Sequence, residues 1–259
     1  MSLDAQQQAS ADQFSKQAAH YGRTHILANT ADVAELLDFI PESERTGPAL
    51  DIATGGGHCA LALANAGFSM TIGDVAVPMV QAASNLLHEE GHFCETAVFP
   101  AENVPFPDGS FALVSSRVAP HHFSDPAAFV RESARVLEPG GWFLLIDGSV
   151  PDDDAETEDW IHEVEKLRDP SHARLHSRKA WIKMAESAGL TVVHHSLVPF
   201  LQPDLEWYFS AANTTLENRE KVRELIATAS DHVRTAMHLD TSGPVTWQWQ
   251  RVGLLARKP

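Results

Sequence analysis

Three consecutive glycines are the feature of this 259-residue chain whose type and spacing most directly indicate chemistry. Residues 55–57 follow the apolar run 49–53, which contains one acid, Asp51, and they precede small residues with helical spacing. A glycine-rich turn between a strand and a helix brings backbone N–H groups close to a ligand, because no Cβ blocks the approach. We therefore expect a ligand-binding turn at this position.

The glycine turn alone does not decide between cofactor classes. Gly55, Gly57 and Ala60 fit the spacing G-x-G-x-x-A of dinucleotide-binding proteins, and Asp74 lies about 20 residues beyond the turn, where that motif has its ribose-binding acid. An oxidoreductase that uses NAD or NADP is therefore one hypothesis. Neither of the two tyrosines in the chain has a lysine four residues on, so a Tyr-x-x-x-Lys pair is absent.

Fourteen histidines raise the question of a metal site. His172 and His176 are four residues apart with Asp169 just before them, but such a pair binds metal only on a continuous helix. Pro170 favours a loop or a helix start there. The H-E-x-x-H pattern is absent as well. We expect no metal.

The elements that must position these residues alternate between strands and helices. Apolar runs and helical spacing predict the following order: strand 49–53, helix 58–66, strand 69–73, helix 78–90, strand 92–99, strand 111–115, helix 126–137, strand 142–147. This alternation is typical of parallel pairing in an α/β sheet. A helical pattern at 12–40 precedes it, after a polar start expected to be frayed. The segments that follow it are helices at 152–167 and 177–188, strand 191–200, a mostly helical stretch 203–239, and a last strand within 244–258.

Composition excludes several classes of function. The chain has 19 Lys and Arg against 35 Asp and Glu, a net charge of −16 with His neutral, which disfavours nucleic acid and anionic lipid as partners. Residues 52–73 carry no charge and could span a bilayer by length, but their five glycines predict strand, loop, helix and strand instead. Two cysteines and a polar N-terminus favour a reducing, cytoplasmic location.

Further segments accompany the glycine turn in a fixed order. Asp74-Val75 is followed by Met79, and three segments occur later: 105–111 (PFPDGSF), 117–123 (RVAPHHF), 135–141 (RVLEPGG). Together with the turn, which stands where the family has D/E-x-G-x-G-x-G, they resemble the Rossmann-like (class I) S-adenosylmethionine-dependent methyltransferases over roughly residues 14–200. The type 11 branch, with the ubiquinone and menaquinone C-methyltransferases, is the most similar. The resemblance implies a doubly wound, mostly parallel seven-stranded sheet with an antiparallel last strand and inserted helices.

The resemblance also implies a function and an organisation. One domain, 1–259, would comprise a helical lid (1–40), a cofactor-binding core (41–150), and acceptor-side helices with the last two strands (151–259). The activity would be in-line methyl transfer from S-adenosylmethionine to a small molecule, by a monomer or a homodimer. Two alternative functions stay open, an oxidoreductase and a cofactor-binding protein without catalytic activity. The second is open because Ala53 replaces the first glycine of the family motif and Pro100 replaces an acid that is frequent in the family.

Ten cofactor-binding residues are implied by the resemblance. Asp51 would lie near the methionine ammonium, Asp74 would accept hydrogen bonds from both ribose hydroxyls, and Ala101 with Glu102 would meet the adenine edge. The full set is Asp51, Ala53, Gly55, Gly57, Asp74, Val75, Met79, Ala101, Glu102 and Arg117.

The acceptor side is predicted from position. His121 and His122 follow the fourth strand, at the sheet edge where ligands bind in such folds, and are our candidates for a base or a substrate contact. A structural histidine bonded to backbone is the alternative. The resemblance places four further substrate-binding candidates in the lid and in the insertion after the fifth strand: Tyr21, Asp169, His172, Arg174. The alternatives are helix packing for the lid residue and a salt-bridged helix end for the other three.

Overall fold

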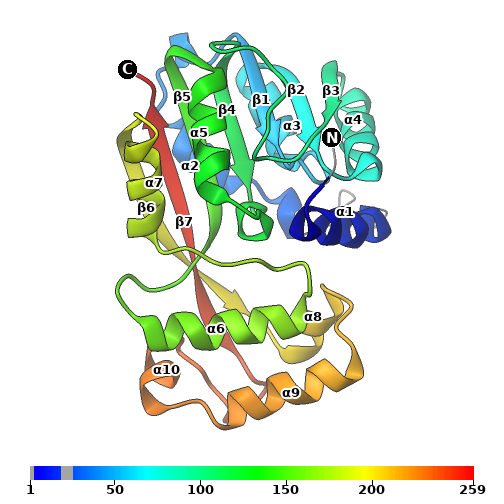
Figure 1. Ribbon diagram of the computed structural model, residues 1–259, viewed down its shortest axis with the longest axis vertical. Coiled ribbons are helices and arrows are strands. Elements are labelled where there is room, and N and C mark those ends of the chain that lie inside the picture. The colour runs from blue at the N-terminus through cyan, green and yellow to red at the C-terminus, as the bar shows by residue number, and fades with distance from the viewer. Residues whose placement is uncertain (1–2, 19–25) are drawn as a thin grey trace.

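A single sheet organises the molecule. The computed structural model describes residues 3–18 and 26–259, and seven strands of these residues pair in the order β3-β2-β1-β4-β5-β7-β6 (Figure 1). Strands β1 to β5 are parallel, whereas β7 is antiparallel to both β5 and β6. The predicted α/β class with its antiparallel last strand is therefore confirmed. The strands are Pro48–Ile52 (β1), Ser69–Asp74 (β2), Cys94–Val98 (β3), Phe111–Arg117 (β4), Leu137–Ser149 (β5), Thr191–Gln202 (β6) and Trp247–Arg257 (β7).

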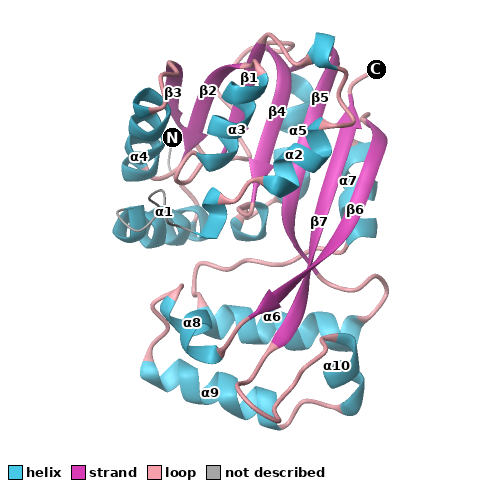
Figure 2. Ribbon diagram, turned by 180° about the vertical axis from the view of Figure 1, so that it is seen from behind, coloured by secondary structure: helices cyan, strands magenta, loops and turns pink. Residues whose placement is uncertain are grey.

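Helices cover both faces of the sheet. Figure 1 shows α5 and α7 in front of the strands, and Figure 2 shows α2, α3 and α4 on the opposite face. The helices of these two layers are Ala31–Leu37 (α2), His58–Ala66 (α3), Val77–Glu89 (α4), Pro126–Val136 (α5) and Arg178–Ser187 (α7). A doubly wound sheet of this kind buries both faces of its central strands.

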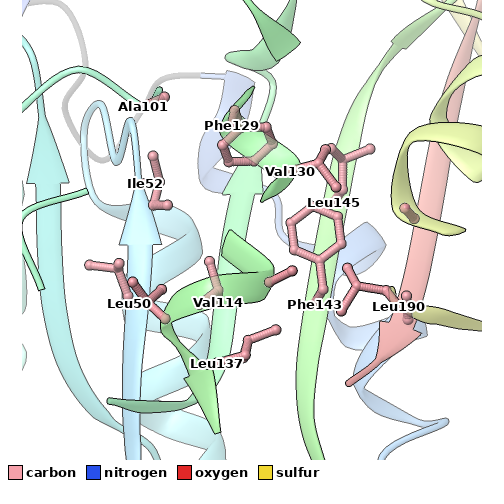
Figure 3. Packing of buried hydrophobic residues seen from close by; sticks show 14 of the residues in the cluster. Leu50, Ile52, Ala101, Val114, Phe129, Val130, Leu137, Phe143, Leu145 and Leu190 are labelled. Carbon is pink, nitrogen blue, oxygen red and sulfur yellow. The ribbon is translucent and has the colours of Figure 1, made fainter. Parts of the chain in front are cut away.

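Two hydrophobic cores follow from the alternation of side chains along the strands. Ala49 packs with α2, α3 and α4, whereas its neighbour Leu50 packs with α5 and α7. Leu144 and Leu145 divide in the same way, because successive residues of a strand point to opposite faces. Figure 3 shows the second of these cores, with Phe129 of α5 beside the strand residues.

A third core lies beyond the sheet. The far halves of β6 and β7 leave the sheet and enter a helical unit (Figure 1), whose helices are Ala155–Arg168 (α6), Leu205–Ser210 (α8), Leu216–Ala227 (α9) and Asp231–Ala236 (α10). Trp247 of β7 and Tyr208 of α8 are both fully buried in its interior. The strands therefore join this unit to the sheet through continuous backbone.

The N-terminal prediction is only partly right. Helix α1, Ala5–Gln17, begins within the stretch expected to be frayed, and Asp4 and Gln7 form a capping box at its start. The continuous helix expected over 12–40 is absent from the described residues, where a short 3₁₀ turn, Ile26–Ala28, precedes α2. Tyr21 lies outside the described residues.

Two other expectations have clear outcomes. The strand predicted at 142–147 begins earlier than expected, since residues 139–141 also lie inside β5, where the register with β4 shifts between Phe111 and Leu113. The uncharged run 52–73 forms the end of β1, then α3 and β2, as predicted. Among the described residues, no helix combines the length and the apolar character needed to cross a membrane.

Candidate active site

The glycine turn adopts a left-handed backbone at three of its positions. Ala53 has φ 55°, Gly55 has φ 53° and Gly57 has φ 83°. A Cβ on Gly57 would lie 2.9 Å from Ala83 of α4, so this glycine also permits close packing. Ala53 adopts its conformation despite its methyl group, at a cost of about 1–2 kcal/mol. The turn therefore keeps its shape although the first family glycine is replaced.

Asp51 lies at the end of β1 and is almost fully buried. Its carboxylate accepts hydrogen bonds from Thr54 Oγ1 at 2.8 Å and from Ser115 Oγ at 2.6 Å. Burial raises the pKa of Asp51, and the two hydroxyl donors act in the opposite direction. The carboxylate is thus held rigidly at the wall of a cavity that the glycine turn also lines.

Asp74, at the end of β2, faces the same cavity. One carboxylate oxygen accepts a hydrogen bond from Gly55 N at 3.0 Å and the other from Ala76 N at 2.9 Å. Burial raises the pKa of Asp74 to about 6. Each carboxylate oxygen has two lone pairs, so each keeps one for a ligand after bonding to backbone.

The first cavity extends from the glycine turn to the N-terminal helix. It encloses about 870 Å³ of empty space, part of which is open to solvent. Its wall includes the predicted residues Val75, Ala101 and Glu102. Met79 is fully buried in α4 and is not among the described wall residues. Gly57 is not among them either.

Glu102 connects the cavity wall to its surroundings. One carboxylate oxygen accepts a hydrogen bond from Ser124 N at 2.8 Å, and the other from Gln7 Nε2 of α1 at 2.8 Å. Gln7, Ser10 and Phe14 of α1 also line the cavity. Sequence reasoning named none of the three, although the resemblance implied a helical lid over residues 1–40, because the polar composition of this helix does not show which of its side chains face a site.

Arg117, the last residue of β4, binds the segment that leads into α2. Its Nε donates to the Asp32 carboxylate at 3.0 Å, while Nη1 and Nη2 donate to the carbonyls of Leu27 at 2.8 Å and Asn29 at 2.7 Å. Arg251 of β7 donates to the same carboxylate at 3.2 Å. Arg117 lines the first cavity, but these contacts make it an anchor for the N-terminal segment.

The two adjacent histidines lie on the 3₁₀ turn Pro120–His122 (η4) after β4. His121 Nδ1 is 2.6 Å from Asp147 Oδ1 of β5. Burial opposes protonation of His121, but the negative charge and hydrogen bond of Asp147 outweigh it, so the pKa of His121 is raised. Asp147 is fully buried, and its position at the carboxyl end of β5 was a signal in the sequence that we missed.

His122 has a different environment. Its Nδ1 is 2.9 Å from the carbonyl oxygen of Ser171, to which it donates, and Phe14 packs edge-on against its ring. Burial and the neighbouring His121 lower the pKa of His122 to about 4. A neutral His122 with a proton on Nδ1 therefore presents its Nε2 lone pair.

A second cavity begins where the first one ends. Phe14, Leu27, Val118 and His122 line both cavities, so the two are adjacent. Val118 has φ 53°, a left-handed conformation that is costly for a β-branched residue, and its N–H donates to Ile146 O at 2.7 Å. Strained backbone of this kind is concentrated at functional sites.

The structure brings only part of the predicted substrate set to the second cavity. Asp169 and His172 line it, whereas Arg174 pairs with Glu158 at 2.6 Å and is not among the described wall residues. His172 lies in a loop, as Pro170 suggested. Burial lowers the pKa of His172 strongly.

Three aromatic residues of the second cavity were not predicted: Phe200, Trp207, Trp249. Trp247 and Trp249 are separated by one residue on β7. Trp247 is fully buried in the third core, but Trp249 faces the cavity. No group of three or more His, Cys, Asp or Glu within residues 3–18 and 26–259 is arranged to hold a metal ion.

Comparisons with known proteins agree with this geometry. The family model described as "Methyltransferase domain" matches residues 50–145. The uncharacterized methyltransferase YcgJ of Bacillus subtilis is 37% identical over 174 residues, which are 66% of this chain and 67% of the relative. The demethylmenaquinone methyltransferase of Chlorobaculum tepidum is 34% identical over 110 residues, 42% of this chain and 44% of that protein.

A solved structure extends the match to nearly the whole fold. A candidate methyltransferase from Bacillus halodurans C-125 superposes with a TM-score of 0.83 and 31% identity, covering 88% of this chain and 99% of the other. The sheet order, the glycine turn and these matches all lead to one family. The chain belongs to the methyltransferase domain family, and it is a methyltransferase.

Proposed function

We propose that this methyltransferase uses S-adenosylmethionine as its methyl donor and a small molecule as its acceptor. The observation that carries the proposal is the pair of adjacent cavities that share wall residues. The first is lined by the glycine turn and by Asp51 and Asp74, and the second extends from it toward α6 and the aromatic residues of β6 and β7. A donor and an acceptor in the two cavities would meet at the shared wall.

The residues of the first cavity fit this donor. Asp74 has one lone pair on each carboxylate oxygen for the two ribose hydroxyls, and Asp51 is suited to the methionine ammonium, directly or through water. Gly55 leaves its backbone open to the ligand, and Val75 with the wall at Ala101 suits the adenine. The donor, when bound, supplies a methyl group that is already activated on a sulfonium.

Positioning is then the main task of the protein. Holding two reactants in line supplies most of the rate enhancement for a donor that is already activated. Arg117 holds the segment near Leu27, and Gln7 with Glu102 holds α1 over the cavity, so these contacts would keep water out and the donor in place. His122 lies on the wall that the two cavities share and His121 lines the second cavity, so both are base candidates.

The remaining features of the proposal concern the whole protein. The family membership does not favour the NAD-dependent oxidoreductase, and the left-handed Ala53 argues against a broken turn in an inactive protein. We propose a single domain located in the cytoplasm, present as a monomer or homodimer. The net charge of −16 supports a small-molecule acceptor over nucleic acid.

Thermal unfolding with separate ligands tests the proposal. We expect S-adenosylmethionine and S-adenosylhomocysteine, but not NAD or NADP, to raise the unfolding midpoint. A ligand at 100 times its dissociation constant stabilises a protein by about 2.7 kcal/mol. Asp74→Asn should weaken both ligands by roughly 10- to 100-fold, since one buried hydrogen-bond partner is mismatched.

The matched control is Asp38→Asn. Asp38 is an acid on the surface with an 82% exposed side chain, and it is not among the residues that line either cavity. Its replacement should leave both shifts unchanged. Stabilisation by NAD alone would contradict the proposed donor.

A further inference from the structure

The second cavity has an aromatic wall built by paired strands and a helix. Phe200 of β6 and Trp249 of β7 are register partners, and their rings stack at 5.8 Å with an interplanar angle of 16°. Trp207 of α8 lies 6.2 Å from the Phe200 ring. Flat aromatic surfaces favour a flat, conjugated ligand, because rings gain stability by stacking beyond the area that they bury.

The same cavity is also lined by an imidazole that is held by a carboxylate. His121 lines the cavity with a 16% exposed side chain, whereas the side chain of its partner Asp147 is completely buried. Because Nδ1–H donates to Asp147 Oδ1 at 2.6 Å, Nε2 is the nitrogen left to accept a proton. Asp147 Oδ2 is buried without a hydrogen-bond partner among the described residues. The negative charge of this carboxylate therefore stabilises the protonated form of His121.

His121 and His122 are therefore not equivalent. A buried carboxylate next to an imidazole fixes its tautomer and stabilises the imidazolium that forms when it takes a proton. His122 has a backbone carbonyl in that place, and burial lowers its pKa to about 4, so it is too weak a base near neutral pH. The geometry makes His121 the stronger base and leaves His122 as a wall between the cavities.

We propose that His121, oriented by Asp147, is the general base of the reaction, and that the second cavity binds a flat aromatic acceptor bearing a hydroxyl group. This inference rests on the proposed function. The acceptor hydroxyl gives its proton to Nε2 of His121, and the electron pair left on the acceptor forms the new bond to the methyl carbon. The electron pair of the broken carbon–sulfur bond stays on sulfur. The imidazolium returns its proton to solvent after product release.

Charged groups from several elements set the basicity of His121. Asp147 of β5 is the nearest, and Glu165 and Asp169 at the end of α6 also favour protonation. Cationic or titratable groups facing the same space oppose it: His122, Arg168, His172, Arg251. Arg168 is paired with Glu165 at 2.9 Å and Arg251 with Asp32 at 3.2 Å, which reduces their influence.

The proton transfer can be tested without turnover. The probe is 4-nitrophenol, whose ionised form absorbs visible light, bound to the full-length protein with and without S-adenosylhomocysteine. We expect the bound probe to ionise more readily than free probe by about tenfold or more, because a protonated His121 stabilises the phenolate. His121→Gln should abolish this gain, and Asp147→Asn should reduce it.

A matched control and independent binding data complete the test. His232→Gln removes another histidine–carboxylate pair, with Asp154 at 2.9 Å, on the exposed surface of α10, and it should leave the ionisation of the probe unchanged. Thermal stabilisation by S-adenosylhomocysteine in the same samples reports donor binding separately. If the bound probe ionises equally in wild type and His121→Gln, the base assignment is wrong. If the protein binds S-adenosylhomocysteine but not 4-nitrophenol, the acceptor class is wrong.

Methyl transfer to 1-naphthol gives a second readout. General base catalysis contributes about 10²- to 10⁴-fold, so Asp147→Asn should lower kcat for 1-naphthol by a factor in that range with a smaller change in KM. The pH at which the rate reaches half of its maximum should also be lower than in wild type, because the pKa of His121 falls when Asp147 loses its charge and the unprotonated imidazole is then present at lower pH. An unchanged pH profile in Asp147→Asn would contradict the role of the pair.

Discussion

At the scale of single residues, backbone conformation and burial decide what the site residues can do. Ala53 adopts a conformation that favours glycine, and Asp74 is buried among backbone donors at the end of a parallel strand. The positions of both residues could be predicted from the glycine turn and its spacing. Their strain and burial could not, because these depend on α3 and α4 packing against β1 and β2.

Replacing Ala53 with glycine should stabilise the protein. The left-handed conformation costs an alanine about 1–2 kcal/mol in the folded state, and glycine avoids this cost. Glycine also gives the unfolded chain more freedom, which lowers the free energy of unfolding by about 0.4–1 kcal/mol. We expect Ala53→Gly to raise the free energy of unfolding by up to about 1 kcal/mol in urea denaturation, with an unchanged m-value. The control Ala64→Gly, inside α3, should destabilise it. A destabilised Ala53→Gly would show that the turn is not strained.

Asp74 should make stability and ligand affinity respond to pH in opposite directions. Its folded pKa of about 6 lies above the ordinary aspartate pKa of 3.8, so the folded state binds the proton more readily than the unfolded chain does. Its contribution to the free energy of unfolding therefore rises as pH falls from 7 to 4, by roughly 2–3 kcal/mol. Affinity for S-adenosylmethionine should fall below pH 6, because a protonated carboxyl group accepts fewer hydrogen bonds. Calorimetry on wild type and Asp74→Asn separates the two effects, and equal pH profiles would refute the assignment.

At the scale of elements, α1 shows where sequence patterns stop being informative. The helix has few apolar residues, and side-chain amides rather than a hydrophobic stripe connect it to the site. Gln6 Nε2 donates to the carbonyls of His122, at 3.2 Å, and of Ser171. By contrast, α3 was predicted with its observed bounds, because Gly57 and Gly67 with positive φ flank it.

Removing the Gln6 amide should loosen α1 over the first cavity. Gln6→Ala should increase amide hydrogen exchange in α1 and raise the dissociation rate of S-adenosylmethionine by several-fold, with a small effect on global unfolding. Gln8→Ala is the control, since among the described residues the Gln8 side chain bonds only within the helix, to Asp12 Oδ1 at 2.8 Å. Equal exchange rates in the two variants would rule out the anchoring role of Gln6.

At the scale of the whole molecule, long-range pairing made part of the site unpredictable. The apolar runs that alternate with helical segments predicted the strands, so the sequence indicated a parallel sheet. The partner of His121 depends on β4 lying beside β5, where Arg117 pairs with Ile146 and so brings Asp147 next to η4. Phe200 and Trp249 meet only through the antiparallel register of β6 and β7. The spacing of residues along the chain does not predict either contact, His121 with Asp147 or Phe200 with Trp249.

A single domain should unfold in one step. Trp247 is fully buried in the third core and belongs to a strand that continues into the sheet. Trp247→Ala should therefore lower the free energy of unfolding by about 3–5 kcal/mol and shift the unfolding transitions seen by all probes together. Denaturation followed by far-UV circular dichroism and tryptophan fluorescence should give coincident midpoints. Leu216→Ala, at a 79% exposed position, should change little. Separate transitions for the sheet and the helical unit would overturn the single-domain proposal.

The path of β7 has a consequence for how this enzyme can diversify. Val252 is paired with Asp147 on β5, and Trp249, three residues earlier, is paired with Phe200 on β6. The distance between the proton-accepting pair and the stacking surface is therefore set by backbone ladders, not by the side chains that the acceptor meets. Substitutions at the stacking positions can change which acceptor is selected while the reactive geometry stays fixed. Descendants of one ancestral enzyme could thus exchange substrates without rebuilding their chemistry.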